Sequence, residues 1–190
     1  MCLHATISAV LVNDRVIDGL EFGSGTFQHG QTYQCHPLSC ATALAVQRVI
    51  QEDAMIEKAR ENGEYLGQLL AEHFSNRPYV GDVRGRGLFC CVEFVADKQS
   101  KEPFKPSLNI AKRLRLRGLE PGFDVCLFSS SGCADGYKGD HFLLAPPFIA
   151  TQAELEEIVI RAGKVVDSVF AEIRMERMEM RERSGMNGWL

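Results

Sequence analysis

The chain has 190 residues, 45% of them hydrophobic and 24% charged, and its formal net charge is −4 at neutral pH. This mixture predicts a folded protein with a substantial core, and the acidic balance argues against a protein that coats nucleic acid. No apolar run approaches the ~20 residues that span a bilayer, and residues 1–7 lack the pattern of a signal peptide. With seven cysteines and no export signal, we expect a cytoplasmic protein whose thiols stay reduced.

The N-terminal third predicts a piece of a large buried core. Residues 7–12 form a short apolar, β-branched run that stops at Asn13, which predicts a strand in a sheet covered on both faces. The neighbours of such a strand would lie upstream of Met1. Pro37 can open a helix whose residues 38–46 are apolar nearly all round, and this predicts a helix buried on every side.

The rest of the chain predicts a smaller mixed domain that begins with a helix. Asp53 can cap this amphipathic helix, and the change in helix character places a domain boundary between residues 52 and 53. Its apolar stripe comprises Met55, Ile56, Ala59, Leu66, Leu69, Leu70 and Phe74.

Short strands and two further helices follow in the predicted small domain. A glycine-rich turn leads into a strand at residues 88–95, and further strands are expected at 125–128 and 142–145. Ser107 can cap a helix that stops at Gly118. Thr151 and Glu154 match a capping box, and residues at helical spacing continue to residue 173. The charged tail 174–190 extends this helix and then frays.

Three clusters have a functional and a structural interpretation. Cys35, His36 and Cys40 offer too few ligands for a closed zinc site, so buried thiols are favoured and no metal is expected. Residues 81–87 are rich in glycine but lack the ending of a phosphate-binding loop, which favours a sharp turn. Residues 112–117 carry a basic cluster that could touch phosphates, but their apolar partners favour a helix with a solvated basic face and no nucleic acid partner.

One loop has residue types that are better suited to binding a ligand. His29, Thr32, Tyr33 and His36 lie close together just before the helix that opens at Pro37. Loops at a helix start gather hydroxyl and backbone N–H donors, which suit an anion. From the residues alone, a binding role and a capped structural turn are equally favoured.

This loop also resembles a known family. Residues 25–41, with the sequence GTFQHGQTYQCHPLSCA, are similar to the class-III aminotransferases, which are pyridoxal-phosphate enzymes of fold type I. Further similar stretches follow the family order, and the resemblance spans roughly residues 5–173. They are residues 9–14, 80–88, 136–141 and 144–147.

The resemblance implies an α/β fold that is only part of the family's enzyme. It implies the end of a three-layer α/β/α large cofactor domain at residues 1–52, an α+β small C-terminal domain at 53–173 and a charged tail at 174–190. In the family the Schiff-base lysine lies shortly before the strand that matches residues 9–12, and none of the seven lysines of this chain matches it. We therefore expect the C-terminal half of an aminotransferase, with no catalytic residue of its own.

The resemblance further implies a cofactor, substrates and a partner. It implies pyridoxal 5'-phosphate, an amine donor, a keto or aldehyde acceptor, and a homodimer whose active site lies at the interface. Thr32 matches the family threonine that hydrogen-bonds the cofactor phosphate of the neighbouring subunit. The alternative is a non-catalytic remnant or a dimerising, modulatory subunit.

Two positions depart from the family pattern. Members that grip an amino-acid carboxylate often carry an arginine shortly before the Pro-Pro pair, where residues 142–145 have none. Cys35 stands where the family motif has glycine, and we expect its side chain to crowd the loop.

Overall fold

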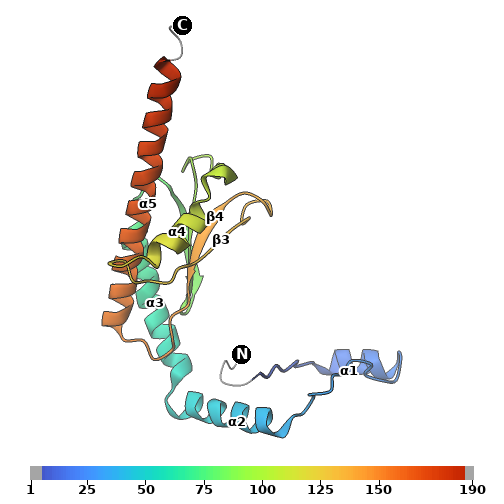
Figure 1. Cartoon of the computed structure of the whole chain (residues 1–190). Helices are drawn as coiled ribbons and strands as arrows, with labels where there is room; N and C mark the ends of the chain where they lie inside the picture. The colour runs from blue at the N-terminus through green and yellow to red at the C-terminus, as the bar shows by residue number, and fades with distance from the viewer. Residues whose placement is uncertain (1–5, 187–190) are drawn as a thin grey trace. The chain divides into compact units, whose positions relative to one another are not determined.

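The chain, seen here as a computed structural model, is described over residues 6–186, with side chains described up to residue 180. It divides into two compact units, Met1–Met55 and Ile56–Leu190 (Figure 1). Within the described residues no helix has the length and apolar character needed to cross a membrane.

The first unit holds two helices. Helix α1 (Asp14–Glu21) begins after Asn13, whose side chain accepts a hydrogen bond from the Val16 N–H at 3.2 Å. Helix α2 (Pro37–Glu52) begins with a proline, as the sequence predicts. Helix α1 was not expected, although Asn13 is a favoured N-cap residue that could have indicated it.

Three expectations about this part of the chain are wrong. Residues 7–12 form no strand, and the side chains of Val10 and Leu11 are 87% and 96% exposed. A strand needs a hydrogen-bonded neighbour, and the described part of this unit contains none. Helix α2 has no buried residue, because the described residues of the unit place nothing over its apolar surface. Asp53 ends α2 as its C-cap instead of capping the next helix.

The second unit is built on a four-stranded antiparallel sheet. Its strands are β1 (Val80–Arg86), β2 (Phe89–Phe94), β3 (Phe128–Ser131) and β4 (Asp140–Leu144), in the order β1-β2-β4-β3. Side chains alternate between the two faces of the sheet. On β2 and β4 the buried face carries Cys90, Val92, Phe94, Phe142 and Leu144.

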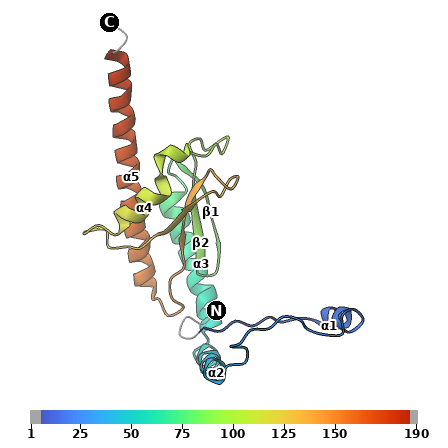
Figure 2. The ribbon, with the colours of Figure 1, turned by 45° about the vertical axis from the view of Figure 1, so that its right-hand side comes forward.

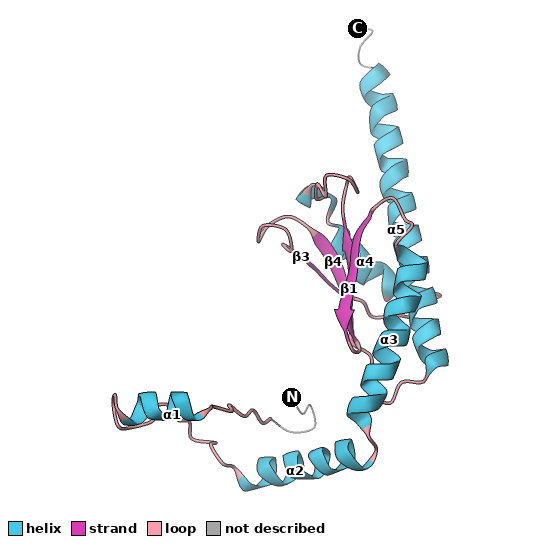
Figure 3. Cartoon of the chain, turned by 180° about the vertical axis from the view of Figure 1, so that it is seen from behind, coloured by secondary structure: helices cyan, strands magenta, loops and turns pink. Residues whose placement is uncertain are grey.

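Three helices cover that buried face. Helices α3 (Met55–Phe74), α4 (Ile110–Gly118) and α5 (Gln152–Met186) lie on the same side of the sheet (Figure 3), with α3 beside α5 (Figure 2). Phe142 of β4 meets Phe74 of α3 at a ring-centroid distance of 5.6 Å, and Phe94 of β2 meets Phe170 of α5 at 5.4 Å. One aromatic-rich core therefore joins the sheet to its helices.

The sequence predicted much of this unit. Thr151 and Glu154 form the expected capping box: the Glu154 N–H donates to Thr151 Oγ1 at 3.3 Å, and the Thr151 N–H donates to Glu154 Oε2 at 2.8 Å. The predicted apolar stripe of α5 is buried, except that Ile158 is half-buried. Helix α4 ends at Gly118 as predicted, but it begins at Ile110 because Ser107 lies in a short 3-10 turn, Pro106–Leu108.

Other elements of this unit differ from expectation. Ile56 is 74% exposed and does not belong to the buried stripe of α3. Strand β3 begins three residues later than expected, at Phe128. Residues 81–86 belong to β1, where a turn was predicted. Gly85 permits the pairing, because a Cβ there would lie 2.6 Å from the carbonyl oxygen of Phe89.

Candidate functional site

The predicted binding loop leads directly into helix α2. A turn closes where the Gln34 N–H donates to the Gln31 carbonyl at 3.0 Å, and the His36 N–H donates to the Tyr33 carbonyl at 3.3 Å. Cys35 then takes φ 55°, and Pro37 starts the helix. The chain thus reverses in a compact turn just before the helix N-terminus.

The backbone conformation at Cys35 shows why the family has glycine at this position. A φ of 55° lies in the left-handed region, which glycine adopts without steric cost and other residues adopt rarely. The family glycine therefore suits this backbone position, and Cys35 occupies it with some strain. The Cys35 side chain is exposed, so the departure affects the backbone rather than filling the loop.

Thr32 lies within this turn with an exposed side chain. Among the residues described, its hydroxyl has no hydrogen-bond partner, and backbone groups alone close the turn. A threonine that caps a turn uses its hydroxyl to do so. The Thr32 hydroxyl is thus available to a group outside the turn.

The start of α2 favours an anion. The first helical hydrogen bond runs from the Cys40 N–H to the His36 carbonyl at 3.0 Å, so the N–H groups of the first turn before it have no helical acceptor. His36 provides no side-chain cap, and the first turn carries no acidic residue. These donors and the positive end of the helix dipole are suited to a phosphate. Thr32 and the α2 N-terminus therefore form a candidate anion site.

The other residues of the loop are exposed and make few contacts. The His29 ring packs edge-on against Phe27 with centroids 5.7 Å apart. Tyr33 is 76% exposed. Among the side chains that the structure describes, up to residue 180, no three or more His, Cys, Asp or Glu residues come together in a set that could hold a metal. Cys35 and Cys40 are exposed, which corrects the expectation of buried thiols.

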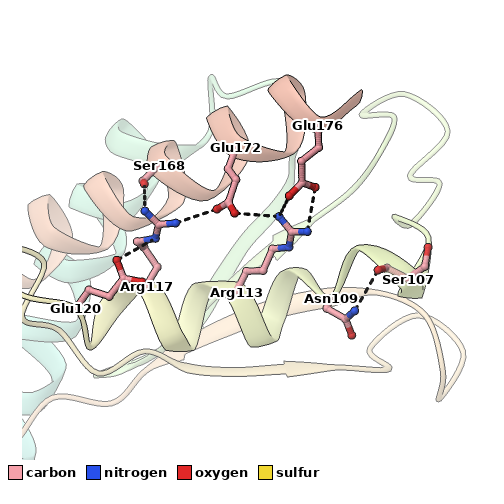
Figure 4. Close-up of polar contacts among 8 residues, drawn as sticks. All are labelled: Ser107, Asn109, Arg113, Arg117, Glu120, Ser168, Glu172 and Glu176. Atoms are coloured by element: carbon pink, nitrogen blue, oxygen red, sulfur yellow. Dashed lines mark hydrogen bonds and ion pairs between the residues drawn. The ribbon is translucent and has the colours of Figure 1, made fainter. Parts of the chain in front are cut away.

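The basic cluster at residues 112–117 faces helix α5 in part (Figure 4). Arg113 donates to both carboxylate oxygens of Glu176, at 2.9 and 3.0 Å. Arg117 donates to Glu172 at 2.9 Å and to Ser168 at 3.1 Å. Two of the arginines are thus partly buried in ion pairs, which corrects the expectation of a wholly solvated basic face.

Sequence reasoning missed a hollow on the face of the sheet that the helices leave open. It measures about 450 Å³, and β1, β2 and β4 all contribute to it. Leu143, one of the residues that stand in place of a carboxylate-binding arginine, lines it. The alternating pattern of β2 and β4 could have indicated the open face, but no residue pattern indicated that β1 borders it.

Comparison with known proteins gives one consistent result. Residues 5–165 match the family described as aminotransferase class-III. An aminotransferase of Gibberella zeae is 46% identical over 85% of this chain and 32% of its own length. The chain therefore spans about a third of the length of the curated relatives it matches.

Solved structures agree. A transaminase from the marine bacterium Virgibacillus superposes with a TM-score of 0.73 at 29% identity, over 85% of this chain and 35% of its own. An aminotransferase of Vibrio fluvialis in its PMP-bound form superposes with a TM-score of 0.68 at 30% identity, over 83% of this chain and 32% of its own.

Proposed function

Because this chain belongs to the class-III aminotransferase family, we propose that it forms the C-terminal part of a pyridoxal-phosphate-dependent aminotransferase. The enzyme transfers an amino group from an amine or amino acid to a keto or aldehyde acceptor. When bound, the cofactor supplies an electron sink for this chemistry. The PMP-bound Vibrio fluvialis relative supports the cofactor, since PMP is the amine form of pyridoxal phosphate.

The residues of this chain hold the cofactor rather than react with it. Thr32 donates its hydroxyl hydrogen to a phosphate oxygen, and the N-terminus of α2 adds its dipole and unpaired N–H groups. None of the seven lysines matches the family's catalytic position, so the proposal assigns that lysine to a part of the protein outside this sequence. The observation that carries the proposal is the Thr32 hydroxyl, which has no hydrogen-bond partner among the described residues and lies shortly before the start of α2 in the chain.

The proposal includes a homodimer with the active site at the interface. Thr32 then serves the cofactor of the neighbouring subunit. The exposed apolar side chains of the first unit support a partner surface, because single exposed apolar residues are ordinary but clusters of them are not. They include Val10, Leu11, Val12, Val16, Ile17, Phe22, Phe27, Leu38, Leu44 and Val49. The enzyme so assembled acts in the cytoplasm.

The test uses a chimera in which the N-terminal part of the Gibberella zeae relative precedes this chain. Thr32→Val keeps the side-chain shape and removes the hydroxyl. A hydrogen bond to a charged group is worth about 1.5–3 kcal/mol, so cofactor affinity should fall roughly ten- to a hundred-fold. Thr26→Val is the matched control, since Thr26 lies in the same exposed loop. Titration with pyridoxal phosphate measures both affinities.

Equal affinities for the two valine variants, with folding intact, would show that Thr32 does not bind the phosphate. The competing function is a non-catalytic or modulatory subunit, which the unmatched lysines favour. That function is supported if the chimera binds the cofactor and dimerises but shows no transamination with any amine donor offered.

A further inference from the structure

The open face of the sheet carries a row of side chains that no role has yet explained. Arg84 of β1, Cys91 of β2 and Leu143 of β4 lie opposite one another in the strand register. Arg86 and Phe89 lie two residues further along their strands, on the same face by alternation. All five line the hollow of about 450 Å³, a volume within the range of small-molecule sites.

Arg84 and the two thiols of this hollow contribute no uncompensated charge. Arg84 donates to Glu93 at 2.6 Å and to Asp82 at 2.8 Å. Cys133 is exposed, but partial loss of solvent around its thiol, followed by the charge of Glu93, raises the pKa of Cys133 to about 11, and burial raises the pKa of Cys91. Both thiols are therefore uncharged at neutral pH.

Arg86 is the exception. It is exposed at the end of β1, and among the side chains described, residues 6–180, no carboxylate lies in ion-pair range of it. Its strand partner, Phe89, is 59% exposed. An uncompensated guanidinium thus lies beside an exposed aromatic ring, and the ring is continuous with the apolar wall of Cys91 and Leu143. A guanidinium binds a carboxylate through two parallel hydrogen bonds.

His141 adds an independent observation. It lines the same hollow, and its Nδ1 atom is buried without a hydrogen-bond partner among the described residues. Buried polar atoms are nearly always hydrogen-bonded, and an ion or water bound nearby is a usual explanation for an exception. An ordered water or ion beside the His141 ring would satisfy this nitrogen.

We propose that this hollow binds a small carboxylate with an apolar body, with Arg86 holding the carboxylate and Phe89, Cys91 and Leu143 contacting the apolar part. The site lies wholly within the second unit. It requires neither the cofactor nor the dimer. Because the hollow is open and the probe small, we expect a dissociation constant on the order of 1 mM.

The test titrates the full ¹⁵N-labelled chain with 3-phenylpropanoate and follows amide chemical shifts. We expect saturable shifts at Arg86, Phe89 and Leu143. The neutral 3-phenylpropanamide has the same body without the charge, and it should bind about ten-fold more weakly. Arg86→Gln should weaken the acid about ten-fold and leave the amide unchanged, because only the acid uses the guanidinium charge.

Arg115→Gln is the matched control. Arg115 is an exposed arginine of α4 outside the hollow, so its loss changes the net charge by the same amount. The proposal is overturned if acid and amide bind equally, if Arg86→Gln binds the acid as well as the native chain does, or if the shifts map to α2 or α4 instead. A second variant, Leu143→Glu, should repel the acid by its charge. Unchanged binding by that variant would also overturn the assignment.

Discussion

Replacing Asp140 should destabilise the start of helix α4, because this residue of another element caps the helix. Asn109 precedes the helix in a left-handed conformation and provides no side-chain cap. Asp140 of β4 caps the helix instead, because its Oδ1 accepts the Ala111 N–H at 3.1 Å. The side chain is 5% exposed, and burial raises the pKa of Asp140 against the opposing effects of the Ala111 N–H and His141.

Two substitutions separate the hydrogen bond from the charge. Asp140→Ala leaves the Ala111 N–H buried without an acceptor, which should lower the free energy of unfolding by about 1–3 kcal/mol. Asp140→Asn keeps an acceptor oxygen of the same shape, so its cost at neutral pH should stay within about 1 kcal/mol. Urea unfolding followed by circular dichroism measures both values.

The pH dependence of stability gives a second readout. A carboxyl whose pKa is raised in the folded state binds its proton more tightly there than in the unfolded chain. Its contribution is therefore largest below the ordinary aspartate pKa, and it is lost as the pH rises from about 4 to the raised value. The Asn variant lacks this loss. The reasoning is refuted if Asn costs as much as Ala, or if the native-minus-Asn difference does not change with pH.

Three further predictions concern the ion pairs, the loop and the lysines. A double-mutant cycle on Arg113 and Glu176 should give a coupling energy of about 1 kcal/mol, because the pair is bidentate and partly buried. The exposed pair Arg60–Glu64 should give a coupling energy of about 0.3 kcal/mol. Equal coupling energies for the two pairs would contradict this prediction. Cys35→Gly should relieve the left-handed backbone and slow hydrogen exchange in the loop turn, while faster exchange would show that the turn does not depend on that conformation. Borohydride treatment with pyridoxal phosphate should label no single lysine of the 190-residue chain stoichiometrically, and peptide mapping that finds one such lysine would refute the assignment of the catalytic lysine elsewhere.

Local signals predicted the elements of the second unit that depend on their own residues. The capping box of Thr151 and Glu154 and the apolar spacing of α5 are properties of one segment, and both are confirmed. Gly118 ends α4 for the same local reason. The start of that helix was predicted wrongly, because its capping residue, Asp140, lies in a strand and is 29 residues from Ala111 in the sequence.

The elements that the sequence predicted wrongly depend on contacts with other segments of the chain. Residues 7–12 have the composition of a buried strand, but composition provides no hydrogen-bonded partner. Strand β1 was missed because its glycines and charges disfavour a strand, whereas pairing with β2 requires a residue without a side chain at Gly85. At the candidate site the sequence identified Thr32 and the α2 start. Only the structure shows that the Thr32 hydroxyl has no hydrogen-bond partner among the residues described.

The central claim is that Thr32 binds a cofactor phosphate across a subunit interface, and mixed dimers of the chimera test it most directly. One subunit carries the catalytic lysine replaced and Thr32 intact, and the other carries the lysine intact and Thr32→Val. If Thr32 serves the neighbouring subunit, the only lysine-competent site also has an intact Thr32, and it should bind pyridoxal phosphate with unimpaired affinity. If that site instead shows the roughly ten- to hundred-fold loss of the Thr32→Val homodimer, Thr32 acts within its own subunit and the claim is contradicted.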